Sequence, residues 1–269
     1  MSAKPSYTSE FVINWRYLTS ASLGLAAGYS LVNYITNIFT PRLLAEFDWS
    51  KSEVALVGIA AFLGIITQPL AGRLTDIFGV RRVASIGVVF APLVFIGFAS
   101  MTGSLWQFFV LTFLQVLIVG GTTSAVIYNR LVAQSFVRAR GVAFAIAASA
   151  APVAGALLVP VFSLVMNWYG WRWGFLAAAL FSAIVGVIAL FLIPGEAEKP
   201  HSGAQVLQQR VTKSKHGIYL LILKSRAFKI LFVGFLLCNM SFTLQTQHLQ
   251  VVLLDNGVTA AIAALAHYK

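Results

Sequence analysis

Gly72-Arg-Leu-Thr-Asp-Ile-Phe-Gly-Val-Arg-Arg82 is a short polar stretch that lies between two long apolar runs. It contains two glycines, one acid and three arginines, a composition typical of a tight loop at a surface. The apolar runs on either side, residues 54–71 and 83–101, are about as long as a helix that crosses a bilayer. The sequence therefore predicts a polar loop that joins two membrane-spanning helices.

The overall composition also requires a lipid environment. Apolar residues make up 59% of the chain, charged residues make up 10%, and the mean hydropathy is +0.84. An ordinary soluble domain carries about 25% charged residues. The net charge of +11 could suggest a nucleic acid as partner. We expect none, because the charges are concentrated between the apolar runs, and we predict the lipid bilayer as the main partner.

Windows of roughly 20 apolar residues predict seven membrane spans and an all-α membrane protein. The predicted spans are 15–39, 54–71, 83–101, 105–127, 141–166, 173–193 and 228–247. The first is interpreted as an uncleaved helix, because no small-residue cleavage site follows it. We divide the chain into a six-helix bundle over residues 1–193, a basic linker over 194–226, and a third part over 227–269. This last part holds the seventh helix and the start of an incomplete second bundle.

The basic residues predict the orientation of the spans. The N-terminus and the connections after spans two, four and six hold 15 of the 19 lysines and arginines. Lysine and arginine concentrate in cytoplasmic connections. The pattern therefore predicts a multi-pass protein of the plasma (inner) membrane with its N-terminus in the cytoplasm.

The polar stretch matches the pattern Gly-x-Leu-x-Asp-x-x-Gly-x-Arg-Arg and resembles the signature loop of the major facilitator superfamily. In that family the loop joins the second and third helices. Residues 47–53, 138–141 and 170–173 resemble the monocarboxylate and oxalate/formate branch of the family. The resemblance implies two six-helix bundles around a central cavity, with alternating access by rocking of one bundle against the other. The first of these bundles is complete here, whereas the second is barely begun.

The resemblance also implies roles for residues 72–82, named the gating loop from here on. In the family this loop latches against the second bundle when the carrier opens outward, which assigns gating to Gly72, Asp76, Gly79, Arg81 and Arg82. The glycines permit tight turns at helix ends, and Asp76 can meet an arginine or a helix N-terminus. The alternative is that the arginines only fix the topology by reaching lipid phosphates. We favour this alternative for Arg82.

Polar residues recur on one face of three predicted spans. They are Tyr29, Asn33 and Asn37 in the first span, Gln115, Thr122 and Asn129 along the fourth, and Asn239, Thr243 and Gln247 in the seventh. Lipid cannot satisfy such groups, so they face a cavity or another helix. The family lines its substrate cavity with these three helices, and we predict that role here. Hydrogen bonds within or between helices are the alternative.

Arg130, which directly follows the fourth span, is a further candidate for the cavity. Its guanidinium could bind a carboxylate through two hydrogen bonds. A charge that fixes the cytoplasmic side of the membrane is the favoured interpretation.

The sequence carries no motif for catalysis or for a cofactor. The four histidines lack metal-ligand spacing, and there is neither a nucleotide-binding glycine loop nor a pair of carboxylates. We expect a protein that is not an enzyme and has neither cofactor nor metal site. The leading hypothesis is secondary active transport of a small organic solute, with a mono- or dicarboxylate favoured. A coupling ion and a missing C-terminal half would then complete the carrier. The alternative is a truncated, non-functional remnant of such a carrier.

Overall fold

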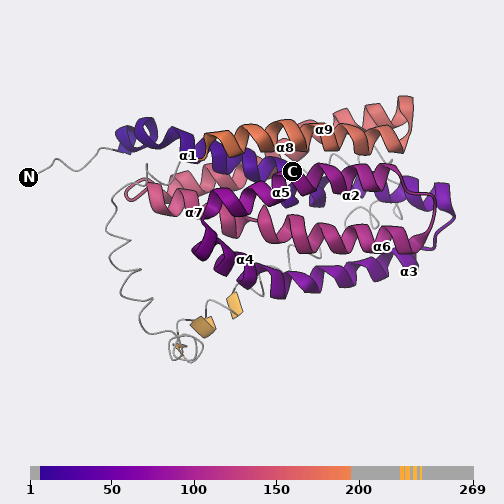
Figure 1. The fold of residues 1–269 in the computed structure, drawn as a ribbon, viewed down its shortest axis with the longest axis horizontal. Helices are drawn as coiled ribbons and strands as arrows, with labels where there is room; N and C mark the ends of the chain where they lie inside the picture. The colour runs from indigo at the N-terminus through magenta and orange to yellow at the C-terminus, as the bar shows by residue number, and fades with distance from the viewer. Residues whose placement is uncertain (1–6, 195–224, 227, 231–232, 235–236, 238–269) are drawn as a thin grey trace, which may run out of the picture. The chain divides into compact units, whose positions relative to one another are not determined.

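The computed structural model describes residues 7–194 and, further on, residues 225–226, 228–230, 233–234 and 237 (Figure 1). The chain divides into two compact units, residues 1–202 and 203–269. In the first unit the described residues form helices and short connections and contain no strand. The predicted all-α membrane fold is therefore confirmed. The spans predicted at 15–39 and 54–71 run as broken helices, whereas four helical stretches are long and apolar enough to cross a membrane. These four are Val80–Ala99, Leu105–Ser135, Arg140–Tyr169 and Trp171–Leu192.

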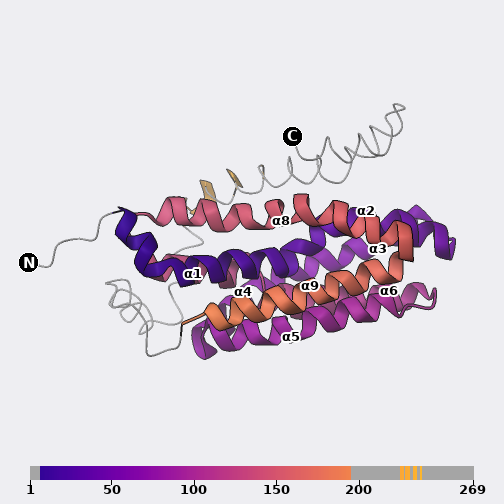
Figure 2. The same cartoon turned by 90° about the horizontal axis from the view of Figure 1, so that it is seen from above.

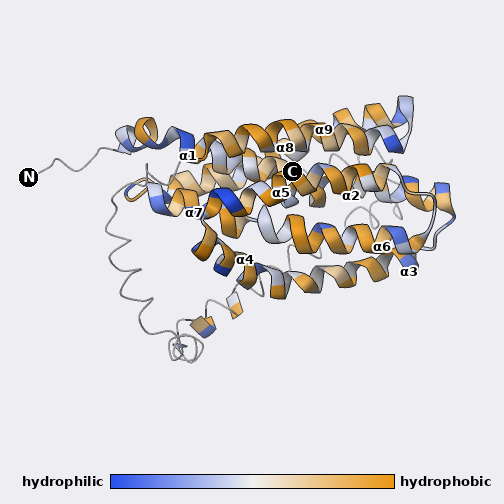
Figure 3. Cartoon of the chain, in the orientation of Figure 1, coloured by the Kyte–Doolittle hydropathy of each residue, from blue (hydrophilic) through white to orange (hydrophobic). Residues whose placement is uncertain are grey.

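The described helices follow the predicted order of spans. They are α1 (Tyr7–Ala27), α2 (Tyr29–Phe47), α3 (Lys51–Val57), η1 (Gly58–Leu63), α4 (Gly64–Phe78), α5 (Val80–Ala99), α6 (Leu105–Leu114), η2 (Gln115–Gly120), α7 (Ala125–Ser135), α8 (Arg140–Tyr169) and α9 (Trp171–Leu192). The first span comprises α1 and α2, the second comprises α3, η1 and α4, and the fourth comprises α6, η2 and α7. Side chains with hydrophilic character gather mainly at the two ends of this bundle (Figure 3). We name them the Gly79 end and the Gly170 end, after the glycine that lies at each.

The gating loop differs from its prediction, because most of it is helical. Helix α4 continues through Asp76 to Phe78, and α5 begins at Val80, so that Gly79 alone joins the two helices. The backbone of Gly79 has φ 82° and ψ 159°, a conformation that only glycine adopts without strain. Gly72, which was expected in a turn, is a helical residue within α4. The polar residues can continue the helix because its end needs no loop to bring their side chains to water.

Helix α3 begins where the sequence forms a capping box. The Ser50 hydroxyl accepts a hydrogen bond from the Glu53 amide at 3.2 Å, and the Glu53 carboxylate accepts one from the Ser50 amide at 2.8 Å. Two amides that the first helical turn leaves unpaired are thereby satisfied. The capping box fixes the point at which the chain re-enters the bundle after α2.

The first unit is held together by apolar packing between helices distant in sequence. Helix α5 packs against α9, and α1 packs against both α8 and α9 (Figure 2). Toward the Gly170 end the core is aromatic: the Phe175 ring stacks on Phe39 with 3.9 Å between centroids and on Phe98 with 5.2 Å. A second cluster, around Tyr128 and Phe136, packs toward the Gly79 end. The two clusters bracket the middle of the bundle, where the candidate site lies.

Replacing Gly24 with alanine is expected to destabilise the first unit by about 1–3 kcal/mol, because the added methyl group overpacks the core. A Cβ atom at Gly24 would lie 2.2 Å from two ring atoms of Tyr128, whose side chain is fully buried and cannot swing aside. The melting temperature of the detergent-solubilised protein measures the effect. Gly141→Ala is the matched control, since a Cβ there would meet no atom within 4 Å. Equal melting temperatures of the two variants would contradict the close approach of α1 to Tyr128.

Candidate functional site

The fourth span is interrupted near its middle, whereas the sequence predicted a continuous helix over residues 105–127. Its first half ends in a π-helical turn, Gln115–Gly120, and its second half, α7, begins only after Ser124. Ser124 has φ −76° and ψ 168°, an extended conformation. The interruption falls on the run Gly120-Gly-Thr-Thr-Ser124, and glycine, threonine and serine all favour a helix less than alanine or leucine does. The break leaves amides at the start of α7 without helical partners.

The first span is interrupted at the same level, at Gly28, and the two breaks touch. The amide of Tyr29, the first residue of α2, donates a hydrogen bond to the Thr123 hydroxyl at 3.0 Å. The same hydroxyl donates to the carbonyl of Val119 at 2.7 Å. A Cβ at Gly28 would lie 2.8 Å from the Thr123 Cβ, so only glycine fits at the contact. The breaks of spans one and four therefore form one junction, which we name the break junction.

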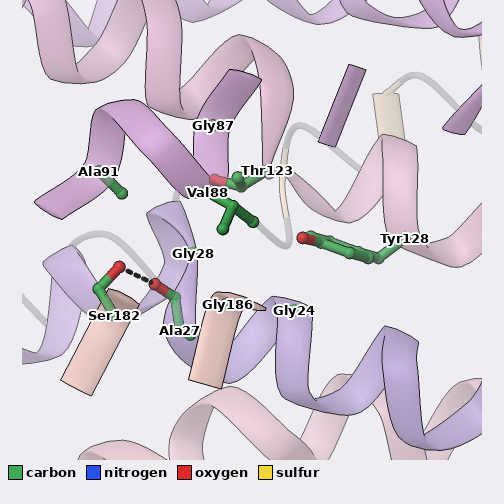
Figure 4. A pocket seen from close by; sticks show the side chains of 10 residues that line it. All are labelled: Gly24, Ala27, Gly28, Gly87, Val88, Ala91, Thr123, Tyr128, Ser182 and Gly186. Atoms are coloured by element: carbon green, nitrogen blue, oxygen red, sulfur yellow. Dashed lines mark hydrogen bonds between the residues drawn. The ribbon is translucent and has the colours of Figure 1, made fainter. Parts of the chain in front are cut away.

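Helix α9 also contributes to the break junction. The Ser182 hydroxyl donates to the carbonyl of Ala27 at 2.9 Å and so satisfies an acceptor that the end of α1 leaves unpaired (Figure 4). A narrow empty volume of about 180 Å³ lies here, lined by Gly28, Thr123, Ser182 and neighbouring small residues. Its lining contains no charged side chain. We interpret it as a gap left by close helix packing, distinct from the face on which a solute would bind.

Two buried hydroxyls beside the break junction lack a hydrogen-bond partner within the described part of the chain. They belong to Thr67 of α4, which is 3% exposed, and to Ser124, which is 6% exposed. Thr67 lies next to Gly121, and Ser124 is the N-cap residue of α7 but makes no capping bond. Val126, in the first turn of α7, is exposed. The N-terminus of α7 thus presents unpaired donors at an accessible surface, an arrangement that suits an anion.

The structure places the other predicted cavity residues as follows. Tyr29 is half-buried at the break junction. Gln115 and Thr122 are buried, and the Thr122 hydroxyl donates to the carbonyl of Ile118 at 2.5 Å. Asn129 is half-buried, and its side-chain oxygen has no hydrogen-bond partner among the described residues. The side chains of Asn33 and Asn37 lie outside the described part of the structure, as do residues Asn239, Thr243 and Gln247. The assignment of all of these residues to a substrate cavity stays a prediction.

Arg130 of α7 joins the gating loop at the Gly79 end. Its guanidinium forms an ion pair with the carboxylate of Asp76 and donates a hydrogen bond to the carbonyl of Gly72 at 3.2 Å. The ends of spans two and four are thereby connected. Sequence reasoning missed this pair, because the two residues are 54 positions apart. The signal available was that both belong to the same predicted side of the membrane. Arg81 and Arg82 are exposed in the first turn of α5.

Glu10 of α1 is a second residue that the sequence analysis missed. Its carboxylate is buried, with 4% of the side chain exposed, and accepts hydrogen bonds from the amides of Val137 (3.3 Å), Arg138 (3.1 Å) and Ala139 (2.8 Å). These amides directly precede α8. Burial by itself would raise the pKa of Glu10, but the three hydrogen bonds and the charge of Arg138 together hold that pKa below its ordinary value. Glu10 thus fixes the start of α1 to the connection between spans four and five.

Broken apolar helices, single-glycine connections and a polar gating segment are features of a multi-pass membrane transporter. The family model of the Major Facilitator Superfamily matches residues 22–267. The chain therefore belongs to the major facilitator superfamily of membrane transporters, and it is an integral, multi-pass membrane protein.

Relatives within the superfamily are similar at low identity. The membrane sensor protein UhpC of Escherichia coli is 26% identical over 222 residues, which cover 77% of this chain and 50% of that protein. Monocarboxylate transporter 4 of Rattus norvegicus is 29% identical over 175 residues, which cover 63% of this chain and 36% of that protein. UhpC of Salmonella typhimurium is 27% identical, and the match covers 68% of this chain and 44% of that protein. The chain thus spans half or less of the length of these relatives.

Proposed function

We propose that this protein carries out secondary active transport of a small organic solute by alternating access, and that the solute is a mono- or dicarboxylate. The observation that carries the proposal is the accessible N-terminus of α7 with the unpartnered, buried hydroxyl of Ser124. The start of a helix holds a partial positive charge and unpaired amides, both of which favour a carboxylate. The similarity to a monocarboxylate transporter supports the same substrate class.

The surroundings of the break junction favour an anion as well. No aspartate or glutamate occurs within four residues of Gly28, Thr67 or Ser124 along the sequence. No acidic neighbour along the chain therefore opposes an anion at this position. The hydroxyls of Thr67 and Ser124 can each donate one hydrogen bond, which would replace bonds that a carboxylate loses when it leaves water.

The gating function that we propose rests on the contact between Arg130 and Asp76, named the inner clamp. We place the Gly79 end of the bundle in the cytoplasm, because exposed arginines gather there, namely Arg73, Arg81, Arg82, Arg138 and Arg140. The N-terminus is then cytoplasmic and the membrane is the plasma (inner) membrane. The inner clamp holds the cytoplasmic ends of α4 and α7 in the position from which the gating loop meets the opposite bundle. Either exchange of anions or a coupling ion would supply the driving force.

The similarity to UhpC gives a second candidate, because that relative is named a membrane sensor protein. A sensor would bind the solute without moving it across the membrane. Binding that is not accompanied by uptake would therefore favour sensing over transport.

Ser124→Ala should weaken the apparent affinity for a carboxylate by about tenfold, because a hydrogen bond to a charged group contributes roughly 1.5 kcal/mol or more. The measurement is uptake of radiolabelled lactate and oxalate into membrane vesicles over a range of concentrations. Ser135→Ala is the matched control, since its hydroxyl is also buried and unpartnered but belongs to the last residue of α7. The same KM in both variants would contradict a site at the break junction.

A further inference from the structure

The two halves of the six-helix bundle repeat one design. Each half has a broken first span, and in each half a single glycine joins the second span to the third. Gly79 has φ 82° and ψ 159°, and Gly170 has φ 91° and ψ 166°. Each glycine amide donates to the carbonyl four residues earlier, of Thr75 or Met166, at 3.0 Å. Because a half contains three spans, the second half crosses the membrane in the opposite sense, and its glycine lies at the opposite end.

The inner clamp has a counterpart at the Gly170 end. Asp76 lies three residues before the joining glycine of its half, and its partner Arg130 lies five residues before the end of α7. Asn167 likewise lies three residues before the joining glycine of the second half, and Arg42 lies five residues before the end of α2. The guanidinium of Arg42 donates a hydrogen bond to the side-chain oxygen of Asn167. The same pair of positions is thus connected at each end of the bundle.

Neighbouring contacts at the Gly170 end strengthen the correspondence. Arg172 donates to the carbonyl of Met101 at 3.3 Å and lies 4.0 Å from the carboxylate of Glu46, which is on the same helix as Arg42. The Trp49 indole donates to the carbonyl of Gly103 at 3.1 Å. These bonds connect spans one, three and six at the end where Arg42 and Asn167 connect spans one and five. The Gly170 end is therefore an ordered cluster of cross-helix bonds.

We propose that Arg42 and Asn167 form an outer clamp, which positions the outer ends of α2 and α8 for the conformation that is closed at the outer face. This inference rests on the proposed function. The first and fifth helices carry the outer clamp, as the second and fourth carry the inner clamp. An inverted repeat exchanges inside and outside, so the inner clamp favours the outward-open state and the outer clamp favours the inward-open state. Arg42 and Asn167 are positioning residues and need not touch the solute.

The two clamps differ in charge, which makes them experimentally separable. The inner clamp joins two opposite charges, whereas Asn167 gives the outer clamp a neutral acceptor. Hydrogen bonds between two charged groups are stronger than those with a neutral partner. Asn167→Asp is therefore expected to strengthen the outer clamp, and Asn167→Ala to remove it.

Labelling of a cysteine at the break junction tests the outer clamp without any solute. Cys238 is replaced by serine, and Ala125→Cys in the exposed first turn of α7 is labelled with a membrane-impermeant maleimide added to intact cells. Arg42→Ala and Asn167→Ala should each raise the labelling rate about threefold or more, because they release the outward-open state. Asp76→Asn and Arg130→Ala should lower the rate, and so should Asn167→Asp.

Labelling after denaturation controls for the amount of folded protein in each variant. Rates that move in the same direction for both clamps, or that do not change in Arg42→Ala and Asn167→Ala, would overturn the proposal. Lactate and oxalate uptake measured beside the labelling separates the two proposals. If uptake is absent while the labelling rates move in opposite directions, the carboxylate assignment fails and the outer clamp is supported.

Discussion

Asp76→Asn is expected to reduce the rate of carboxylate uptake by about tenfold, the change that a loss of roughly 1.4 kcal/mol produces in an equilibrium. The carboxylate of Asp76 is the ionic partner of Arg130. With an amide in its place, the guanidinium keeps only a neutral acceptor and its bond to the Gly72 carbonyl. The inner clamp then holds α4 against α7 more weakly, and the outward-open state loses population. Initial rates of uptake, normalised to the amount of protein in the membrane, measure the effect.

The double variant Asp76→Arg, Arg130→Asp provides the control for this prediction. It exchanges the charges between α4 and α7 and should recover part of the lost uptake, whereas either single exchange should not. Asp76 is about half exposed, so little change in stability is expected in any of these variants. Wild-type uptake in Asp76→Asn would show that the ion pair does not contribute to gating.

Glu10→Ala is expected to cost about 3 kcal/mol of stability, because it leaves three buried amides without an acceptor. These amides belong to the connection that leads into α8, and no other acceptor in the described part of the chain bonds to them. Glu10→Gln keeps one carbonyl oxygen and should lie between the wild type and Glu10→Ala. Unfolding in detergent, followed by circular dichroism, gives the three stabilities. A wild-type midpoint for Glu10→Ala would contradict this role.

The lowered pKa of Glu10 also fixes the sign of a pH effect. The ordinary value is 4.5, and the folded protein holds the pKa below it. The folded state therefore binds the proton more weakly than the unfolded chain does. The stability from Glu10 is complete above the ordinary pKa and is lost as the pH falls through the lowered one. Glu10→Gln should show a smaller loss of melting temperature than the wild type between pH 7 and about pH 3.

Features that depend on local composition were predictable from the sequence. Helices α5, α8 and α9 follow the predicted third, fifth and sixth spans, because long apolar runs can be satisfied only as helices in lipid. The gating residues were located correctly between the second and third spans. Their helical conformation was not, because glycine and charge also mark the polar end of a membrane helix.

Features that depend on contacts between distant segments were not predictable. Gly28 is one glycine in an apolar run, and nothing beside it indicates a break until Thr123 is seen to contact it. The partner of Asp76 could not be chosen among the many arginines predicted on the same side. Glu10 looked like an ordinary acid near a terminus, because its three amide donors are more than 120 residues away.

Counterflow of a labelled carboxylate tests the central claim most directly, namely that this protein moves its solute by alternating access. Membrane vesicles containing the chain are loaded with unlabelled lactate and diluted into a low concentration of labelled lactate. We predict saturable uptake that is several-fold faster than in vesicles without internal lactate, because the loaded site returns faster than the empty one. Uptake that rises linearly with concentration and does not respond to internal lactate would contradict the account.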